Sequence, residues 1–247
     1  MKATLLILPL AFAATFANAA EPILPKFDPA NFDQVAAITN PYFPLAAGYV
    51  REYSGTLLGD DGKPFIERIV LTVIGAGPVL DGVPTVLVRD DAWKDGLHVE
   101  EANDYYAQDR DGNVWNMGEN VTNFHYDDAG KLTGTDNHGT WRVGVNESRP
   151  GFMMPGSPQV GFVYEQEHSP IDEALDAGEI MALDGTVTGP TGSYTDVVSV
   201  FETSSIDPDL AEVKYYAKGV GLIRIEEDVD AARTNPTGSL ELISLAD

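Results

Sequence analysis

The sequence has 247 residues and no cysteine, which excludes disulfides, thiolate metal sites and cysteine nucleophiles. Its 39 acidic residues against 15 Lys and Arg give a formal net charge of −24, which excludes nucleic acids and anionic membrane faces as expected partners. Aromatic and β-branched residues are plentiful, which excludes a disordered chain.

The first residues have the features of a secretory signal peptide. Lys2 precedes an apolar run from Ala3 to Phe16, and Ala17-Asn18-Ala19 offers the small residues that signal peptidase requires. The alternative is a retained N-terminal anchor, but the sequence that follows is acidic and rich in proline, without a basic flank. We expect residues 1–19 to be removed near Ala19. We then expect residues 20–247 to form a single domain, periplasmic or extracellular, with no stable membrane insertion.

Short strands separated by turns are predicted along most of the remaining chain. Residues 21–44 contain five prolines and are expected to form an irregular arm or a short helical turn. The expected strands cover residues 49–55, 65–75, 83–93, 97–108, 114–119, 122–126, 139–143, 160–168, 180–188, 194–203, 211–217, 221–227 and 239–244. The best helical spacing, at residues 171–181, is short and interrupted, so no crossover helix joins the strands.

The turns between these strands favour tight hairpins. Asp81-Gly82, Asp95-Gly96 and Asp111-Gly112 combine residues that tolerate the positive φ angles of such turns. The predicted fold class is therefore all-β: a large curved antiparallel meander sheet, half-barrel or barrel-like, with few short helices.

Residues 146–158 interrupt the strand pattern. They contain three prolines and two glycines around Phe152, Met153 and Met154. We expect a long apolar loop here that crosses an opening of the sheet and plugs it.

Several motifs resemble a family of secreted bacterial proteins to which no activity is assigned. They are NPYFPL at residues 40–45, YAQD at 106–109, GNVW at 112–115, PGFMMP at 150–155 and YYAKGVGL at 215–222. The last third of the chain also resembles periplasmic proteins with half-barrel sheets akin to lipoprotein carriers. The resemblance implies a shared fold, and a fold does not fix a function.

Strand alternation at residues 97–108 predicts the most promising surface. One face carries His98, Glu100, Ala102, Asp104, Tyr106 and Gln108, a polar row that suits a cavity or a solvated surface. The following strand is expected to bring Trp115 and Glu119 onto one face beside this row. We predict a binding protein whose concave face accepts a small or extended apolar, lipid-like ligand. The ligand-binding candidates are Glu100, Asp104, Tyr106, Gln108, Trp115, Phe152, Met153 and Met154.

Other functions remain open from the sequence. A hydrolase or lyase is predicted to use a carboxylate with a histidine, and the candidates are Glu119, His125, His138, Glu165 and Glu167. Converging carboxylates are also typical of a divalent-cation site of the Ca²⁺ type. No transition-metal site is predicted, because Glu119, His125 and His138 lack a specific ligand spacing. No motif for an organic cofactor occurs, and the blandest interpretation of the acidic row is a solvated sheet face.

Overall fold

The computed structural model describes residues 21–59, 61–207, 211–230 and 232–246. The expected signal peptide, residues 1–19, lies outside the described residues. Within the described ranges one fifteen-stranded sheet forms, every pairing between its strands is antiparallel, and the regular helical structure is a single 3-10 turn, Pro29–Asn31. The all-β antiparallel prediction is confirmed. In the same ranges the structure contains no helix that is long and apolar enough to cross a bilayer.

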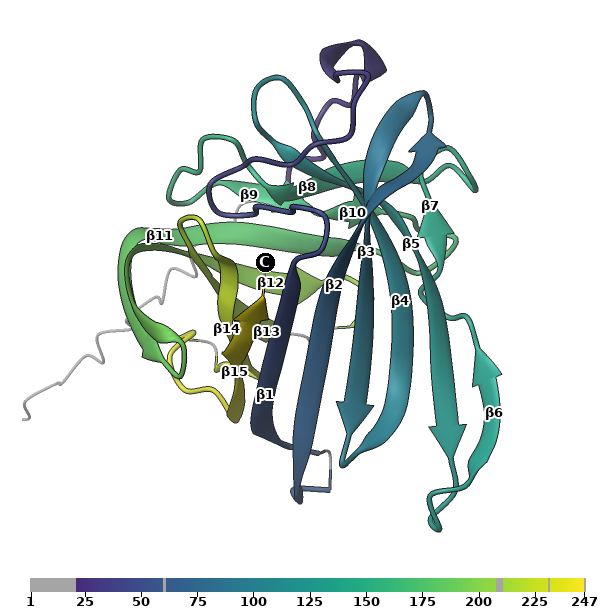
Figure 1. Ribbon diagram of the computed structural model, residues 1–247, viewed down its shortest axis with the longest axis vertical. Helices are drawn as coiled ribbons and strands as arrows, with labels where there is room; N and C mark the ends of the chain where they lie inside the picture. The colour runs from purple at the N-terminus through teal and green to yellow at the C-terminus, as the bar shows by residue number, and fades with distance from the viewer. Residues whose placement is uncertain (1–20, 60, 208–210, 231, 247) are drawn as a thin grey trace, which may run out of the picture.

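Figure 1 shows the strands in chain order from purple to yellow. They are β1 (Val50–Leu58), β2 (Pro64–Leu80), β3 (Val83–Lys94), β4 (Leu97–Gln108), β5 (Val114–Tyr126), β6 (Leu132–Asp136), β7 (Trp141–Arg142), β8 (Arg149–Met154), β9 (Val163–Glu165), β10 (Glu167–His168), β11 (Asp176–Gly189), β12 (Gly192–Ser204), β13 (Ala211–Ala217), β14 (Gly221–Glu227) and β15 (Gly238–Ala246).

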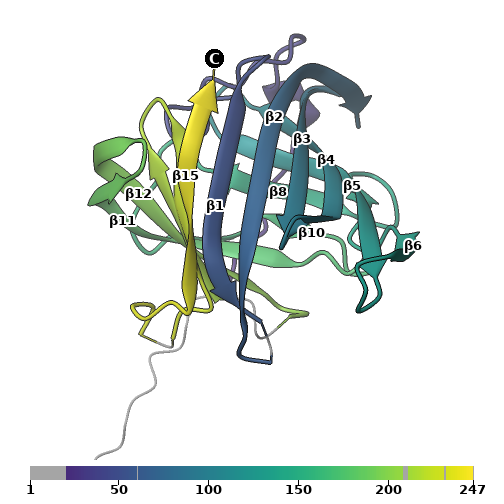
Figure 2. The ribbon, with the colours of Figure 1, turned by 60° about the horizontal axis from the view of Figure 1, so that its bottom comes forward.

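The strand order curls the sheet into a barrel shape with one unsealed seam. The order is β10-β8-β5-β4-β3-β2-β1-β15-β14-β13-β12-β11-β9, with β6 and β7 added beside β5. Figure 2 shows β15 lying against β1, so the end of the chain completes the wall that its beginning started. The two ends of the sheet, β9 and β10, are separated in the chain by Gln166 alone. The backbone therefore crosses the seam at this residue.

Hairpin chemistry and alternation explain why these residues form long strands. Asp81 and Gly82, and likewise Asp95 and Gly96, all have positive φ angles, as two-residue hairpin loops of the primed type require. In β2, the odd-numbered residues from Glu67 to Val73 face the space inside the sheet, which we call the lumen, and Ile66 is exposed on the outer face.

The N-terminal arm packs on two apolar clusters. Phe32, with Phe27 beside it, packs on Trp115 and Met117 outside the lumen. Further along the arm, Ile38 is buried with the strand residues that fill the upper lumen, and Phe43 and Leu45 pack against the same cluster. The arm thus reaches from the outer face to the upper end of the lumen as oriented in Figure 1.

The expected plug at residues 146–158 is not present. Residues Arg149–Met154 form β8, which pairs with β5 on one side and β10 on the other. Gly151 in this strand allows two backbone segments to approach closely and does not form a turn. A Cβ at this position would clash with the backbone oxygen of Glu165. The segment that reaches into the upper lumen is instead the N-terminal arm.

Two further details of the strand prediction were wrong. Residues 114–126 form one strand with an irregularity in its middle, not two strands. The strand predicted at residues 180–188 begins at Asp176, as β11, and so takes in part of the helical spacing at residues 171–181. In both places pairing with a neighbouring strand overrides the local pattern.

Candidate functional site

Two adjoining cavities occupy the lumen. The first has a volume of about 390 Å³ and the second about 180 Å³. Asp90, Asp104, Tyr106, Met153 and Lys214 line both cavities, so the two form one continuous space. The lining side chains come from strands all around the sheet and from the N-terminal arm.

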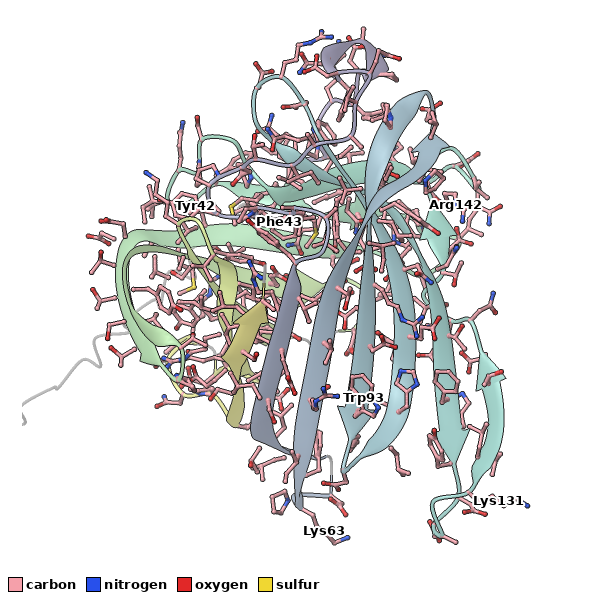
Figure 3. All side chains as sticks on the ribbon, in the orientation of Figure 1. Tyr42, Phe43, Lys63, Trp93, Lys131 and Arg142 are labelled. Atoms are coloured by element: carbon pink, nitrogen blue, oxygen red, sulfur yellow. The ribbon has the colours of Figure 1, made fainter. Side chains whose placement is uncertain are left out.

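The upper part of this space is apolar and aromatic. Phe43 of the arm packs edge-to-face on Tyr106, with ring centroids 5.3 Å apart, and lies 6.2 Å from the ring of Tyr216. Figure 3 shows Phe43 beside Tyr42, above the strands of the C-terminal half. Leu71 and Met153 complete this apolar wall. An apolar molecule placed here would be removed from water on several sides.

The rest of the space is lined by carboxyl groups. Ten acidic side chains face the two cavities, against two cationic ones, Arg51 and Lys214. The ten are Glu67, Asp90, Glu100, Asp104, Glu119, Glu167, Asp176, Glu202, Glu212 and Glu227. We call these ten residues the acidic band.

The two cationic side chains are already engaged. Lys214 Nζ lies 2.6 Å from Glu202 Oε2 and 3.3 Å from Glu212 Oε2. Burial lowers the pKa of Lys214, but these two carboxylates outweigh that effect and hold it well above its usual range. The Nη1 of Arg51 donates to the backbone oxygens of Val50 and Ala246, each at 3.2 Å. Among the described residues, the members of the acidic band that form an ion pair are Glu202 and Glu212.

Burial raises the pKa of several of these carboxyl groups. It raises the pKa of Asp104 to about 7, with a further contribution from Glu100. It raises the pKa of Glu167 to about 8, helped by the charge of Asp176. Burial also raises the pKa of Glu119 well above its usual range, and the charges of Glu167 and Asp104 raise it further.

Glu167 is held by hydrogen bonds, whereas Asp90 is not. The Oε2 of Glu167 accepts a hydrogen bond from the indole of Trp141 at 2.8 Å and one from Asn116 Nδ2 at 3.3 Å. The Oδ1 of Asp90 is buried and has no hydrogen-bond partner among the described residues. Burial and the neighbouring Asp104 and Glu100 raise the pKa of Asp90 well above its usual range.

A bulge in β5 positions Glu119 in the lumen. The register along β4 shifts between Asp104, which pairs with Glu119, and Tyr106, which pairs with Asn116. Gly118 lies within this irregularity at φ +127°, a conformation reserved for glycine. Because of the extra residue, Asn116 and Glu119 both line the lumen, while Trp115 packs with Phe27 and Phe32 outside it. The expectation that Trp115 and Glu119 share a face was wrong for this reason.

The structure places the ligand-binding candidates in and around the lumen. Four of them line it: Glu100, Asp104, Tyr106 and Met153. Met154 is fully buried in the cluster next to it, and Phe152 packs between Trp115 and Tyr164. Gln108 accepts hydrogen bonds from the backbone of Thr39 and Asn40, which fastens the arm to β4. None of these placements tests ligand binding, so the assignments stay predictions.

The catalytic candidates are divided between the lumen and the outside. Glu119 and Glu167 line the lumen. His125 pairs with Asp136 and His138 with Glu173, and all four side chains are largely exposed. The carboxylate of Glu165 contacts the ring of His168. Glu165 belongs to β9 and Glu167 to β10, so the two residues lie at the two ends of the sheet, on either side of Gln166. The lumen carboxylates and the histidines are therefore not brought together.

Glu119, His125 and His138 also do not meet as metal ligands. In the ranges that the structure describes, no group of three or more His, Asp or Glu side chains has an arrangement that could hold a metal ion.

Sequence reasoning missed much of the acidic band and the aromatic Phe43. A signal for Asp90 was present, since it follows Val86 and Val88 at a spacing of two and so occupies an inward position in β3. The same alternation aligns Glu212, Lys214 and Tyr216 in β13. The useful signal was a charged residue at an inward position of a strand whose other inward residues are apolar.

Comparisons with known proteins identify no family. No family model and no curated protein matches the chain. A crystal structure described as a "putative lipoprotein", from Parabacteroides distasonis ATCC 8503, is similar over 86% of this chain and 100% of its own length, with 14% sequence identity and a TM-score of 0.41. This is a distant likeness, and the following proposals are built on the chain's own geometry.

Proposed function

We propose that this protein binds a small organic molecule in its lumen and is an exported binding protein. The observation that carries the proposal is the 390 Å³ cavity, whose wall joins an apolar and aromatic surface to a set of polar side chains. Pockets for small molecules commonly have about 300–1,000 Å³ and combine an apolar lining with a few polar groups that orient the ligand. The barrel-shaped sheet holds these side chains on rigid strands. Export, expected from residues 1–19, is part of the same proposal.

The first test uses the neutral fluorescent probe N-phenyl-1-naphthylamine. It should bind saturably with a rise in emission, because the upper lumen removes it from water. Leu71→Trp should fill the cavity and weaken probe binding by about tenfold or more, corresponding to at least about 1.4 kcal/mol. Ile66→Trp is the matched control, because Ile66 lies on the same strand but is 58% exposed on the outer face.

The proposal has clear contrary outcomes. The absence of saturable probe binding by the folded protein would count against a ligand-binding lumen. Equal binding by the Leu71→Trp and Ile66→Trp variants would place the probe elsewhere. Thermal melting of both variants verifies that each one folds.

A further inference from the structure

The acidic band leaves an excess of acidic over basic side chains inside the protein. Its ten carboxyl groups face two cations, of which Lys214 is paired with Glu202 and Glu212 and Arg51 with backbone oxygens. Once ionised, Asp104 and Glu119 stand as like charges directly opposite one another across β4 and β5. Such pairs destabilise a sheet, so the described side chains alone do not balance this wall.

Asp90 indicates where a positive charge would bind in the lumen. Its Oδ1 atom is buried without a hydrogen-bond partner among the described residues, although the side chain lines both cavities. Buried polar groups in folded proteins are nearly always satisfied, and an unsatisfied one in the wall of a cavity marks a place where a water, an ion or a ligand group binds. Asp90 pairs with Ala102 and its neighbour Val88 pairs with Asp104, so the two aspartates are diagonal neighbours facing the same space.

The aromatic side chains next to these aspartates favour a positive charge as well. The hydroxyl of Tyr106 lies 3.4 Å from Asp104 Oδ2, and Phe43 packs against the rings of both Tyr106 and Tyr216. Aromatic faces carry negative potential and attract ammonium groups. Carboxylates and ring faces thus act on the same region of the lumen.

The arrangement suits an organic cation better than a metal ion. A hard cation such as Ca²⁺ takes six to eight oxygen ligands that converge on one point. The acidic band is instead spread over several strands, and no group of three His, Asp or Glu in the described ranges is arranged for a metal. The adjoining apolar wall would also remain unused by a bare ion.

We infer that the ligand of the lumen is an organic cation, a protonated amine with an apolar body, whose N–H groups can donate to Asp90 Oδ1. Its charged nitrogen lies beside Asp90 and Asp104, and its apolar body lies against Leu71, Met153 and the aromatic rings. This inference rests on the proposed function and names the chemical class of its ligand.

A series of three octyl compounds tests the charge. Octylammonium, octanol and octanoate share an apolar chain and carry a positive, a neutral and a negative head group, and the ammonium also has N–H groups that can donate to Asp90. Each is titrated against the protein loaded with N-phenyl-1-naphthylamine. The cation should displace the probe at a concentration at least about tenfold below that of octanol, and octanoate should be the weakest.

Two neighbouring substitutions locate the effect. Asp90→Asn keeps the shape of the side chain and removes its charge, so it should reduce the advantage of the cation over octanol by about tenfold while octanol displaces the probe as before. Asp91→Asn is the matched control: Asp91 is the adjacent residue on the same strand and pairs on the outer face with Arg89 and His98. It should leave the order of the three compounds unchanged.

The outcomes separate this inference from the proposed function. If the probe binds but octanol or octanoate displaces it as well as the cation does, the ligand class is wrong and the binding function stands. The same conclusion follows if Asp90→Asn leaves the advantage of the cation unchanged. A Ca²⁺-dependent rise in Tm that Asp90→Asn abolishes would assign the site to a metal instead. If the probe does not bind at all, both proposals fail.

Discussion

At the scale of single residues, Asp90 is a costly side chain to place in the lumen. It follows two buried valines in β3, and its Oδ1 has no hydrogen-bond partner among the described residues. Leaving a buried polar group unsatisfied costs about 1–3 kcal/mol, and more when the group is charged. Burial, together with the nearby Asp104 and Glu100, raises the pKa of Asp90 and so favours the protonated form, which lowers this cost.

This retained proton predicts a pH-dependent stability. Above pH 4 the unfolded chain releases the proton of Asp90 while the folded chain keeps it, so the free energy of unfolding falls as pH rises towards the folded-state pKa. Asp104 and Glu100 of β4 act in the same direction, and Lys214 of β13 acts against it. Asp90→Asn cannot ionise, so in denaturant titrations its stability relative to the parent protein should increase from pH 5 to pH 8, by roughly 1 kcal/mol or more.

Asp91→Asn should behave in the opposite way. Burial acts against ionisation of Asp91, but the hydrogen bond from Arg89 outweighs it and lowers the pKa. The pair is partly exposed, so the variant should lose at most about 1 kcal/mol, and at pH 5 as well as pH 8. A parallel shift of both variants with pH would contradict the role given to Asp90.

Some of the residues that line the lumen could be predicted from the sequence. Glu100, Asp104 and Tyr106 were predicted because β4 alternates regularly over the positions that line the lumen. Phe43 was not, because the irregular arm has no period from which to predict its contacts. Lys214 was missed since its partners, Glu202 and Glu212, come from two strands whose pairing no local pattern specifies.

At the scale of elements, the bulge in β5 decides which residues reach the lumen. Gly118 allows an extra residue between Asn116 and Glu119, so both side chains face inward. The neighbouring strand β7 also approaches closely here. A Cβ on Gly118 would lie 2.6 Å from the backbone oxygen of Trp141.

Replacing this glycine should therefore be costly. Gly118→Ala combines an unfavourable φ with a backbone clash and should lower the free energy of unfolding by about 1–3 kcal/mol. The measurement is a denaturant titration, and the probe titration should report weaker binding if the lumen side of β5 shifts. Gly134→Ala in β6 is the control, because its φ is ordinary and nothing lies within 4 Å of the added Cβ. Equal stability of the two variants would show that the bulge is not under constraint.

The elements themselves were predicted unevenly from the sequence. The strands at residues 97–108, 211–217 and 221–227 were predicted with the observed bounds, because Asp-Gly or glycine turns flank regular alternation. β8 was taken for a loop, since Pro150 and Gly151 are typical of turns. Only the contact with the backbone of Glu165 explains why glycine belongs there. A long-range packing requirement of this kind is not visible in a local pattern.

At the scale of the whole molecule, negative charge is concentrated both inside and outside. The chain carries a formal net charge of −24, and ten of its carboxyl groups line the lumen. Net charge far from zero opposes the compact state through self-repulsion.

Salt should therefore stabilise the protein. Raising NaCl from 20 mM to 500 mM at pH 8 should raise Tm, by about 2–4 °C for each kcal/mol of repulsion that is screened. The rise should be smaller at pH 5, where Asp104 and Glu167, whose pKa values are raised to about 7 and about 8, hold their protons. A sucrose series of equal osmolality is the control for effects that do not depend on charge. A Tm that stays constant or falls with NaCl would show that repulsion does not limit stability.

The pairing of β1 with β15 also bears on how the protein is made. Val50 lies opposite Ala246, so one edge of the first long strand has its partner only in the last strand. During synthesis this edge of β1 stays unpaired until β15 has been made. An exposed strand edge can pair with the wrong strand or with another chain. Closure is therefore a late step dominated by sequence-distant contacts, which are slow to form. A stop codon or proteolytic cut before Gly238 would leave β1 and β14 as two open edges, and the product would be prone to aggregation.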